Sequence, residues 1–198
     1  MELNTTFYRL PPETTVRHWA GEAPRGFRFA IKASRLITHY RRLNDCDDEL
    51  EAFFARMAPL APHEGPILYQ LPPQFERDDE RLAAFLELLP TGHHHAFEFR
   101  HKSWWKPEVF ELLRRSHAAF VMYDMGNAKT PAVATSAHAY LRFHGPGHYS
   151  GGYSREALRE WRSRVEETGA TRAWVYFNND LGGHAPRDAR TFRELCGG

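Results

Sequence analysis

AFEFRHKSWWKPEVFELLRRSHAAFVMYD, residues 96–124, contains a strand, a helix and a second strand in direct succession. The segments AFEFRH (96–101) and AAFVMYD (118–124) are apolar and aromatic, as strands buried in a sheet are. Between them, PEVFELLRRSH (107–117) starts with proline and repeats apolar residues at helical spacing. A strand, a helix and another strand predict two parallel strands joined by a crossover helix.

The same alternation continues in both directions along the chain. Only about 125–137 shows no clear helix. Regular alternation predicts a parallel sheet with helices packed outside it. The expected strands are 1–5, 27–33, 66–71, 96–101, 118–124, 139–145 and 172–179, and the expected helices are 12–20, 47–60, 79–89, 107–117, 154–168 and 185–196. Asp47 and Asp48 are candidate helix caps, Ser154 caps the next-to-last helix, and Gly169 closes it.

Seven strands predict an α/β fold of the (β/α)8 TIM-barrel type, incomplete by one strand. A doubly wound open sheet would bury the same strands equally well and is the competing fold. The chain has no linker, low-complexity tract or repeat, so we expect residues 1–198 to form a single domain.

The composition excludes several classes of protein. The chain has 198 residues, 26 basic against 25 acidic, and a net charge of +1, which gives no sign of a nucleic-acid tail or a membrane-binding surface. Cys46 and Cys196 are far apart and form neither a disulfide framework nor a cysteine zinc site, so a cytoplasmic location is expected. No apolar run approaches the length of a membrane-spanning helix, and the N-terminus is unlike a signal peptide.

Polar residues stand where the expected strands end, which is where parallel α/β proteins carry their active sites. Residues two apart on a strand share a face, so Glu98 pairs with Arg100 and Arg142 pairs with His144. Burial of several such charges predicts a shared polar cavity at the carboxyl ends of the strands. The strand-end residues are Asn4, Lys32, Gln70, Glu98, Arg100, His101, Asp124, Arg142, His144, Asn178, Asn179 and Asp180.

These residue types suggest acid/base chemistry on an anion. Glu98 could serve as general acid or base, with His101 or His144 assisting near neutral pH. Lys32, Arg100 and Arg142 would hold a phosphate, a carboxylate or a developing oxyanion. Structural alternatives remain open: an ion pair of Glu98 with an arginine, a solvent-reaching Lys32, a turn-capping Asp124, and a Gln70 that satisfies loop backbone.

Three other features could bind ligands. The run His93–His95 could hold a metal, although it precedes a strand and an exposed loop at the opposite end is the stronger interpretation. The glycines before His184 open the last helix and could bind an anion there, or simply form a turn. Trp104 and Trp105 could stack on a ring or sugar, or pack beneath the loop. A metal site is a further alternative, with His101, Asp124, His144, Asp180 and His184 as ligands, but no metal-binding spacing supports it.

Several segments resemble the domain of unknown function family 72, also called DUF72 or YecE-like. They are ELNTTFYRLP (2–11), FRFAIKASRLITH (27–39), GPILYQLPPQF (65–75), AFEFRHKSWW (96–105), AYLRFHGP (139–146) and YFNNDLGGHAPRDA (176–189), which together span the chain. The resemblance implies a TIM-barrel-type fold in a bacterial or archaeal cytoplasmic protein, and no particular activity. The matching polar positions are Glu2, Asn4, Lys32, His39, Gln70, Glu98, Arg100, His101, Trp104, Arg142, His144, Asn178, Asn179 and His184.

Members of this family usually begin with a further strand and helix, which explains why only seven strands are found. Strands 1–5 and 172–179 should then be exposed sheet edges. We expect one of three outcomes. The start of the chain is incompletely assigned, a partner or a second copy of the chain covers these edges, or the barrel is partly open.

Three hypotheses for function follow. The first is a small-molecule enzyme, a hydrolase, lyase or isomerase, acting on an anionic or sugar-like substrate. The second is metal-assisted binding or cleavage of nucleic acid, against which the near-neutral charge argues. The third is a non-catalytic ligand-binding barrel. No cofactor is identified.

Overall fold

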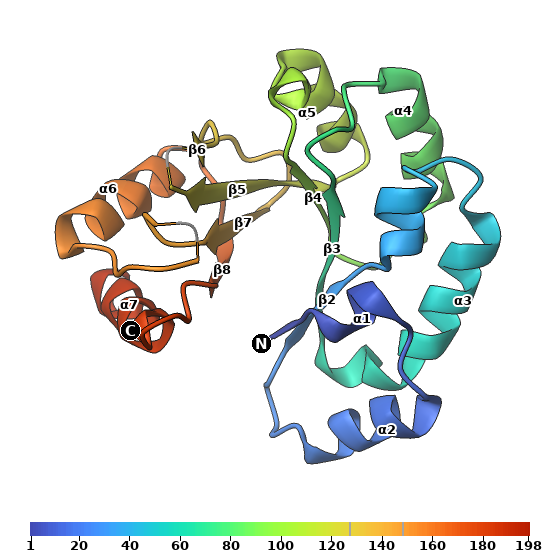
Figure 1. Ribbon diagram of the computed structural model, residues 1–198, viewed down its shortest axis with the longest axis horizontal. Coiled ribbons are helices and arrows are strands. Elements are labelled where there is room, and N and C mark those ends of the chain that lie inside the picture. Colours follow the sequence, from blue (N-terminus) through green and yellow to red (C-terminus); the bar gives the residue numbers. More distant parts are fainter. Residues whose placement is uncertain (127, 148) are drawn as a thin grey trace. The chain divides into compact units, whose positions relative to one another are not determined.

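In the computed structural model, residues 1–126, 128–147 and 149–198 are described, and they form two compact units. The first is Met1–Ala118 and the second is Ala119–Gly198. Each has its own parallel strands and its own covering helices (Figure 1).

The N-terminal unit contains four parallel strands paired in chain order, β1 with β2, β2 with β3 and β3 with β4. Its longer helices lie along one face of these strands (Figure 1). The elements are β1 (Glu2–Leu3), α1 (Thr5–Tyr8), α2 (Glu13–Glu22), β2 (Phe29–Lys32), the π-helix η1 (Leu36–Tyr40), α3 (Asp47–Met57), the 3-10 helix η2 (Ala58–His63), β3 (Glu64–Leu71), α4 (Asp79–Leu88), β4 (His95–Phe99), the 3-10 helix η3 (Lys102–Trp104) and α5 (Pro107–Arg115).

The C-terminal unit contains three parallel strands, again paired in chain order. A short additional strand, β6, pairs antiparallel with β5 in the stretch where no helix was expected. The elements are β5 (Ala119–Met125), β6 (Ala128–Lys129), β7 (His138–Phe143), α6 (Arg155–Glu166), β8 (Arg172–Phe177) and α7 (His184–Leu195).

The predicted alternation is confirmed, because the described residues contain seven parallel strands: β1, β2, β3, β4, β5, β7 and β8. Within each unit neighbouring strands follow one another in sequence, as in a barrel, rather than reversing about a central strand as in a doubly wound sheet.

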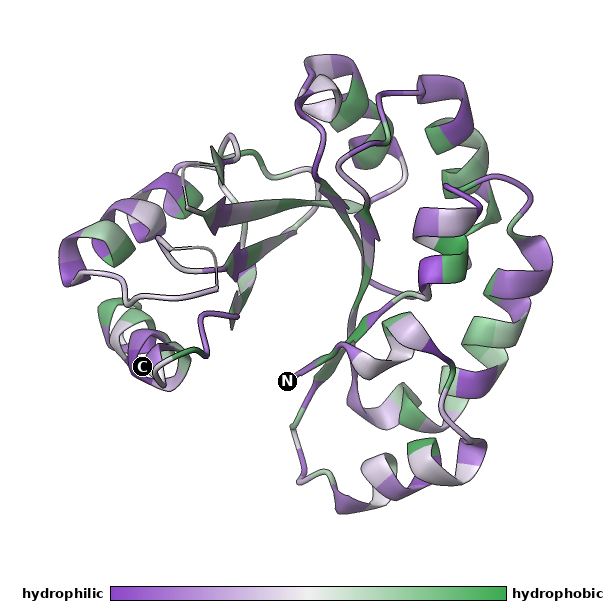
Figure 2. Ribbon diagram, in the orientation of Figure 1, coloured by the Kyte–Doolittle hydropathy of each residue, from purple (hydrophilic) through white to green (hydrophobic). Residues whose placement is uncertain are grey.

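Aromatic packing holds the helices against the strands. In the N-terminal unit Tyr69 stacks on Phe97 at 5.0 Å, and both rings contact Phe85 of α4. In the C-terminal unit Phe143 stacks on Phe177 at 4.7 Å and meets Trp161 of α6 at 5.7 Å. Helices α3 to α5 mix hydrophilic and hydrophobic stretches, as expected when one side of each helix is buried (Figure 2).

Several element boundaries differ from the sequence prediction. The first strand is only Glu2–Leu3, because α1 begins at Thr5 and the Thr6 hydroxyl bonds the carbonyls of Leu3 and Lys32. The π-helix Leu36–Tyr40 was not predicted. Strands β4, β7 and β8 end before Arg100, His144 and Asn178, so these residues follow the strands rather than belong to them.

Two local assignments were wrong. Cys46, not Asp47 or Asp48, is the N-cap of α3, and no side chain caps that end. His95 is not in an exposed loop: it begins β4 and is buried, because its ring lies between the Tyr69 hydroxyl at 3.4 Å and the Pro90 carbonyl at 2.9 Å. The Ser154 cap is confirmed by its bond from the Ala157 amide, and Gly169 adopts φ +75° after α6.

Candidate functional site

Four polar residues of the N-terminal unit follow one another across the carboxyl ends of β2, β3 and β4; we call them the polar row. The Lys32 ammonium donates to Gln70 Oε1 at 2.7 Å. Gln70 and Glu98 are direct partners in the β3–β4 register. The Arg100 guanidinium donates from Nε to the Glu98 carboxylate in an ion pair. The structure therefore brings together Lys32, Gln70, Glu98 and Arg100.

The alternation of side chains along the strands decides where the polar row faces. Phe97 contacts the helix layer through Phe85, and Phe99 stacks on Phe97. Glu98 lies between Phe97 and Phe99 in sequence and therefore points to the opposite face of the strands. Gln70 follows Tyr69, which also contacts Phe85, and so shares the face of Glu98. The polar row thus lies on the face away from α4.

The three charged side chains of the polar row are largely buried. Glu98 is completely inaccessible and Lys32 is 9% exposed, while the Arg100 side chain is 8% exposed. A charged group is stable at such depth only when it is paired and hydrogen-bonded. The ion pair predicted as the structural alternative for Glu98 is therefore present, with Arg100 as the partner.

A small aromatic cluster adjoins Lys32. Its ammonium lies over the Phe7 ring at 4.1 Å, and the His39 ring meets Phe7 edge-on at 4.9 Å. Burial and, to a smaller extent, the positive charges of Lys32 and Arg42 together lower the pKa of His39 to about 4. His39 is therefore neutral at physiological pH and adds no second positive charge beside Lys32.

The other candidates of this unit have local roles. Asn4 is exposed and donates to Glu2 at 3.4 Å. His101 Nδ1 accepts from Ser103, whose hydroxyl lies at 2.8 Å, and so caps η3. Trp104 is completely buried, stacks on Phe99 at 4.8 Å and donates to the Phe75 carbonyl at 2.7 Å. This geometry favours the packing alternative for Trp104 over stacking on a ligand.

In the C-terminal unit, alternation separates the candidates into two sets. Phe143 and Phe177 face α6 and α7, so Arg142, His144 and Asn178, which alternate with them, face the other way. Arg142 and His144 are both buried, and Arg142 is the register partner of Tyr176. His144 contacts the ring of Tyr149 at 5.1 Å.

Asp124 belongs to the set that faces the helices. Its carboxylate accepts from the Trp161 indole of α6 at 2.7 Å and from the Tyr153 hydroxyl at 3.3 Å, and Lys129 lies 3.6 Å away. Burial and the nearby Asp124 charge raise the pKa of Tyr153, which keeps its hydroxyl protonated as the donor. These contacts make Asp124 an anchor between β5 and α6.

Asn179 and His184 lie near the start of α7. The buried Asn179 amide donates to Asp188 at 2.7 Å and to the Gly151 carbonyl at 2.9 Å, while its Oδ1 has no hydrogen-bond partner among the described residues. The His184 ring fills the space beside Gly152, where a Cβ would lie 2.8 Å from Nδ1. The first turn of α7 includes Pro186, which provides no N–H, so fewer donors face an anion there.

Sequence reasoning missed the anchoring partners Tyr153, Trp161 and Asp188. The sequence gives little indication of these partners, because each lies many residues from the strand-end residue that it contacts. Within the described part of the chain, no three His, Cys, Asp or Glu side chains are grouped so as to hold a metal ion. No helix of that part combines the length and apolar character needed to cross a bilayer.

The sequence profile of a family described as "Protein of unknown function DUF72" matches residues 1–198. The chain belongs to the DUF72 family. It is 38% identical over 117 residues to the UPF0759 protein YecE of Escherichia coli K12, a match that covers 58% of this chain and 43% of that protein. It is 27% identical over 235 residues to the UPF0759 protein YunF of Bacillus subtilis, covering 98% of this chain and 82% of that one. The matched segment thus spans less than half of the E. coli relative.

Solved structures of DUF72 proteins share the fold. The crystal structure of a DUF72 protein from Thermotoga maritima MSB8 aligns with a TM-score of 0.86 at 28% identity, over all of this chain and 84% of that one. One from Enterococcus faecalis V583 aligns with a TM-score of 0.84 at 22% identity, over 99% and 88% of the two chains. The DUF72 fold of this chain is α/β, of the incomplete TIM-barrel type with seven parallel strands.

Proposed function

We propose that this DUF72 protein is a small-molecule enzyme that binds an anionic or sugar-like substrate at the polar row. Glu98 would act as the general acid or base, and Lys32 and Arg100 would hold the anion. The observation that supports this is the burial of two cations and one carboxylate, with Gln70 bonded to Lys32 and beside Glu98 in the strand register, at the carboxyl ends of adjacent parallel strands.

The charge of the row favours an anion. Lys32 and Arg100 contribute two positive charges and Glu98 one negative charge, and the neutral His39 adds none. A buried site with excess positive charge attracts carboxylates and phosphates, and excludes water that would otherwise screen the attraction. Sugar hydroxyls could also bond the Gln70 amide and the Glu98 carboxylate.

The test is a thermal-shift screen of phosphorylated metabolites and sugar acids, followed by NMR detection of turnover for each compound that binds. Lys32→Met should weaken binding by about tenfold or more. Lys106→Met, a change of an exposed lysine, should leave binding unchanged. Glu98→Gln should preserve binding and reduce turnover by about 100-fold or more. Binding that survives in Lys32→Met would contradict the assignment of the site.

A non-catalytic ligand-binding role is the second candidate, and the complete burial of Glu98 in its ion pair with Arg100 favours it. In that role Glu98 would only orient the Arg100 guanidinium. Glu98→Gln would then lower both the melting temperature and the affinity, and every bound compound would be recovered unchanged by the native protein. The hypothesis of DNA or RNA cleavage stays a prediction without support from the described geometry.

A further inference from the structure

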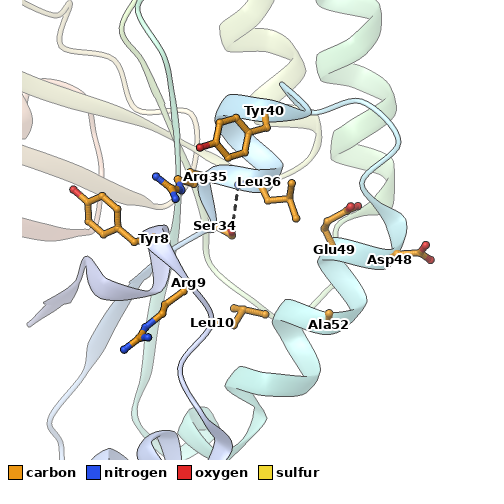
Figure 3. Close-up of a pocket in the computed structure, with 10 residues that line it drawn as sticks. All are labelled: Tyr8, Arg9, Leu10, Ser34, Arg35, Leu36, Tyr40, Asp48, Glu49 and Ala52. Atoms are coloured by element: carbon orange, nitrogen blue, oxygen red, sulfur yellow. Dashed lines mark hydrogen bonds between the residues drawn. The ribbon is translucent and has the colours of Figure 1, made fainter.

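A cavity of about 510 Å³ in the N-terminal unit lies apart from the polar row, since none of the row's four residues lines it (Figure 3). Its volume is that of a small-molecule site. The segment after β1, the segment after β2 and the first turns of α3 form its walls. Leu10, Leu36 and Ala52 supply apolar surface, and two acidic residues line the cavity, the exposed Asp48 and the less exposed Glu49.

The Glu49 carboxylate is only half satisfied. Its Oε1 accepts from the Arg41 guanidinium at 2.7 Å, whereas its Oε2 is buried and has no hydrogen-bond partner among the described residues. The side chain as a whole is 13% exposed. A carboxylate oxygen removed from water without a donor is costly, so Glu49 would gain from a donor that its carboxylate reaches by turning toward the cavity.

Two arginines line the cavity, Arg9 and Arg35, and neither donates to Glu49 Oε2. Arg35 is held elsewhere, with its guanidinium over the rings of Tyr8 at 5.8 Å and Tyr40 at 5.5 Å. Figure 3 shows Arg35 turned toward Tyr8 and away from Glu49, while the Leu36 side chain extends toward Glu49. Glu49 also stands in the first turn of α3, near the positive end of the helix dipole.

We propose that this cavity binds a small organic cation: a primary amine on an apolar body, toward whose ammonium group the Glu49 carboxylate turns so that Oε2 accepts a hydrogen bond. The apolar body would lie against Leu10, Leu36 and Ala52. A cation held by Glu49 is opposite in charge to the anion proposed for the polar row, so the two sites would take different ligands, and this inference does not depend on the proposed function.

The experiment uses the full chain with 13C-labelled leucine methyl groups and three probes of similar shape. These are 2-phenylethylamine, the neutral 2-phenylethanol and the anionic 3-phenylpropionate. We expect the amine to shift the methyl signals of Leu10 and Leu36, with the alcohol binding about tenfold more weakly or worse and the carboxylate not at all.

Variants locate the contact. Glu49→Gln should weaken amine binding by about tenfold or more. The control Glu51→Gln, which changes an exposed glutamate of the same helix, should not weaken it. Arg41→Gln should retain binding, because it removes the partner of Oε1 only. Ala52→Phe is a separate check that does not alter Glu49: its ring should fill the cavity from an exposed helix position and abolish binding.

Three outcomes would overturn the proposal. The first is equal affinity for the amine and the alcohol, which would mean that an apolar hollow alone binds both. The second is unchanged amine affinity in Glu49→Gln. The third is the absence of shifts at Leu10 and Leu36 up to about 10 mM amine, beyond which an affinity would be too weak to matter.

Discussion

Glu98 of the N-terminal unit and Asp124 of the C-terminal unit are both buried carboxylates near the carboxyl ends of parallel strands. They face different layers. Glu98 points away from α4 and pairs with Arg100 in the polar row, whereas Asp124 points to α6 and accepts from the Trp161 indole. The comparison teaches that a strand-end carboxylate is a candidate for chemistry only when its face of the sheet is not covered by helices.

The largest effect that this comparison predicts is on stability at Asp124. Asp124→Ala should lower the free energy of unfolding by about 3 kcal/mol, because it leaves the Trp161 indole and the Tyr153 hydroxyl without their acceptor. Urea denaturation measures this. Asp180→Ala, an exposed aspartate after β8, should change stability by less than about 0.5 kcal/mol.

A double-mutant cycle sharpens the result. Trp161→Phe keeps an aromatic ring against Phe143 but removes the indole donor. Both Trp161→Phe and Asp124→Ala therefore break the same hydrogen bond, and the double variant should lose less unfolding free energy than the sum of the two single losses. A coupling free energy of about 1 kcal/mol between the two changes is expected. Strict additivity would show that Asp124 is not an anchor.

The next effect is on the pH dependence of stability and comes from His39. Its pKa is lowered in the folded state to about 4, so the unfolded chain binds a proton at a higher pH than the folded one. Stability is therefore full above about pH 6.5 and falls as the pH drops toward about 4. We expect a loss of about 1–2 kcal/mol, less than the full shift would give because the ring is partly exposed.

Urea denaturation of native protein and of His39→Gln at several pH values checks this effect. The variant should lose less stability than the native protein between pH 7 and about pH 4, since its side chain does not titrate. Parallel curves for the two proteins would mean that His39 titrates normally in the fold.

A smaller effect tests whether Lys32 and His39 interact. Lys32→Met should raise the pKa of His39, because it removes one positive charge that opposes protonation of the ring. Burial, the larger cause, remains, so the pKa should stay below its ordinary value. NMR titration of the imidazole signals measures the change, and Arg9→Met, a change of an exposed arginine, is the control.

The smallest effect compares the two cysteines, one in each unit. Cys46 is buried, and burial raises its pKa to about 11, whereas Cys196 is exposed. Ellman's reagent should modify Cys196 at least about tenfold faster than Cys46. Cys196→Ser should leave only the slow phase, and two equal rates in the native protein would show that Cys46 is accessible.

The sequence by itself determined the alternation of strands and helices, the number of parallel strands and most of the polar residues at their ends. Hydrophobic periodicity and proline, serine and glycine signals are local properties, which explains why they could be read directly. The residues Lys32, Gln70, Glu98 and Arg100 were all named in advance, because polar residues stand out in or next to apolar strands.

Only the tertiary structure decided which of these residues belong together. Near the ends of the strands, a shift of one residue exchanges the two faces of the sheet, and the boundaries of β4, β7 and β8 could not be fixed from sequence to that accuracy. Asp124 and Asn179 were predicted as site residues, but they are bonded to Trp161 and Asp188, which lie on helices α6 and α7. Contacts between distant segments depend on packing, and packing is what a local pattern does not contain.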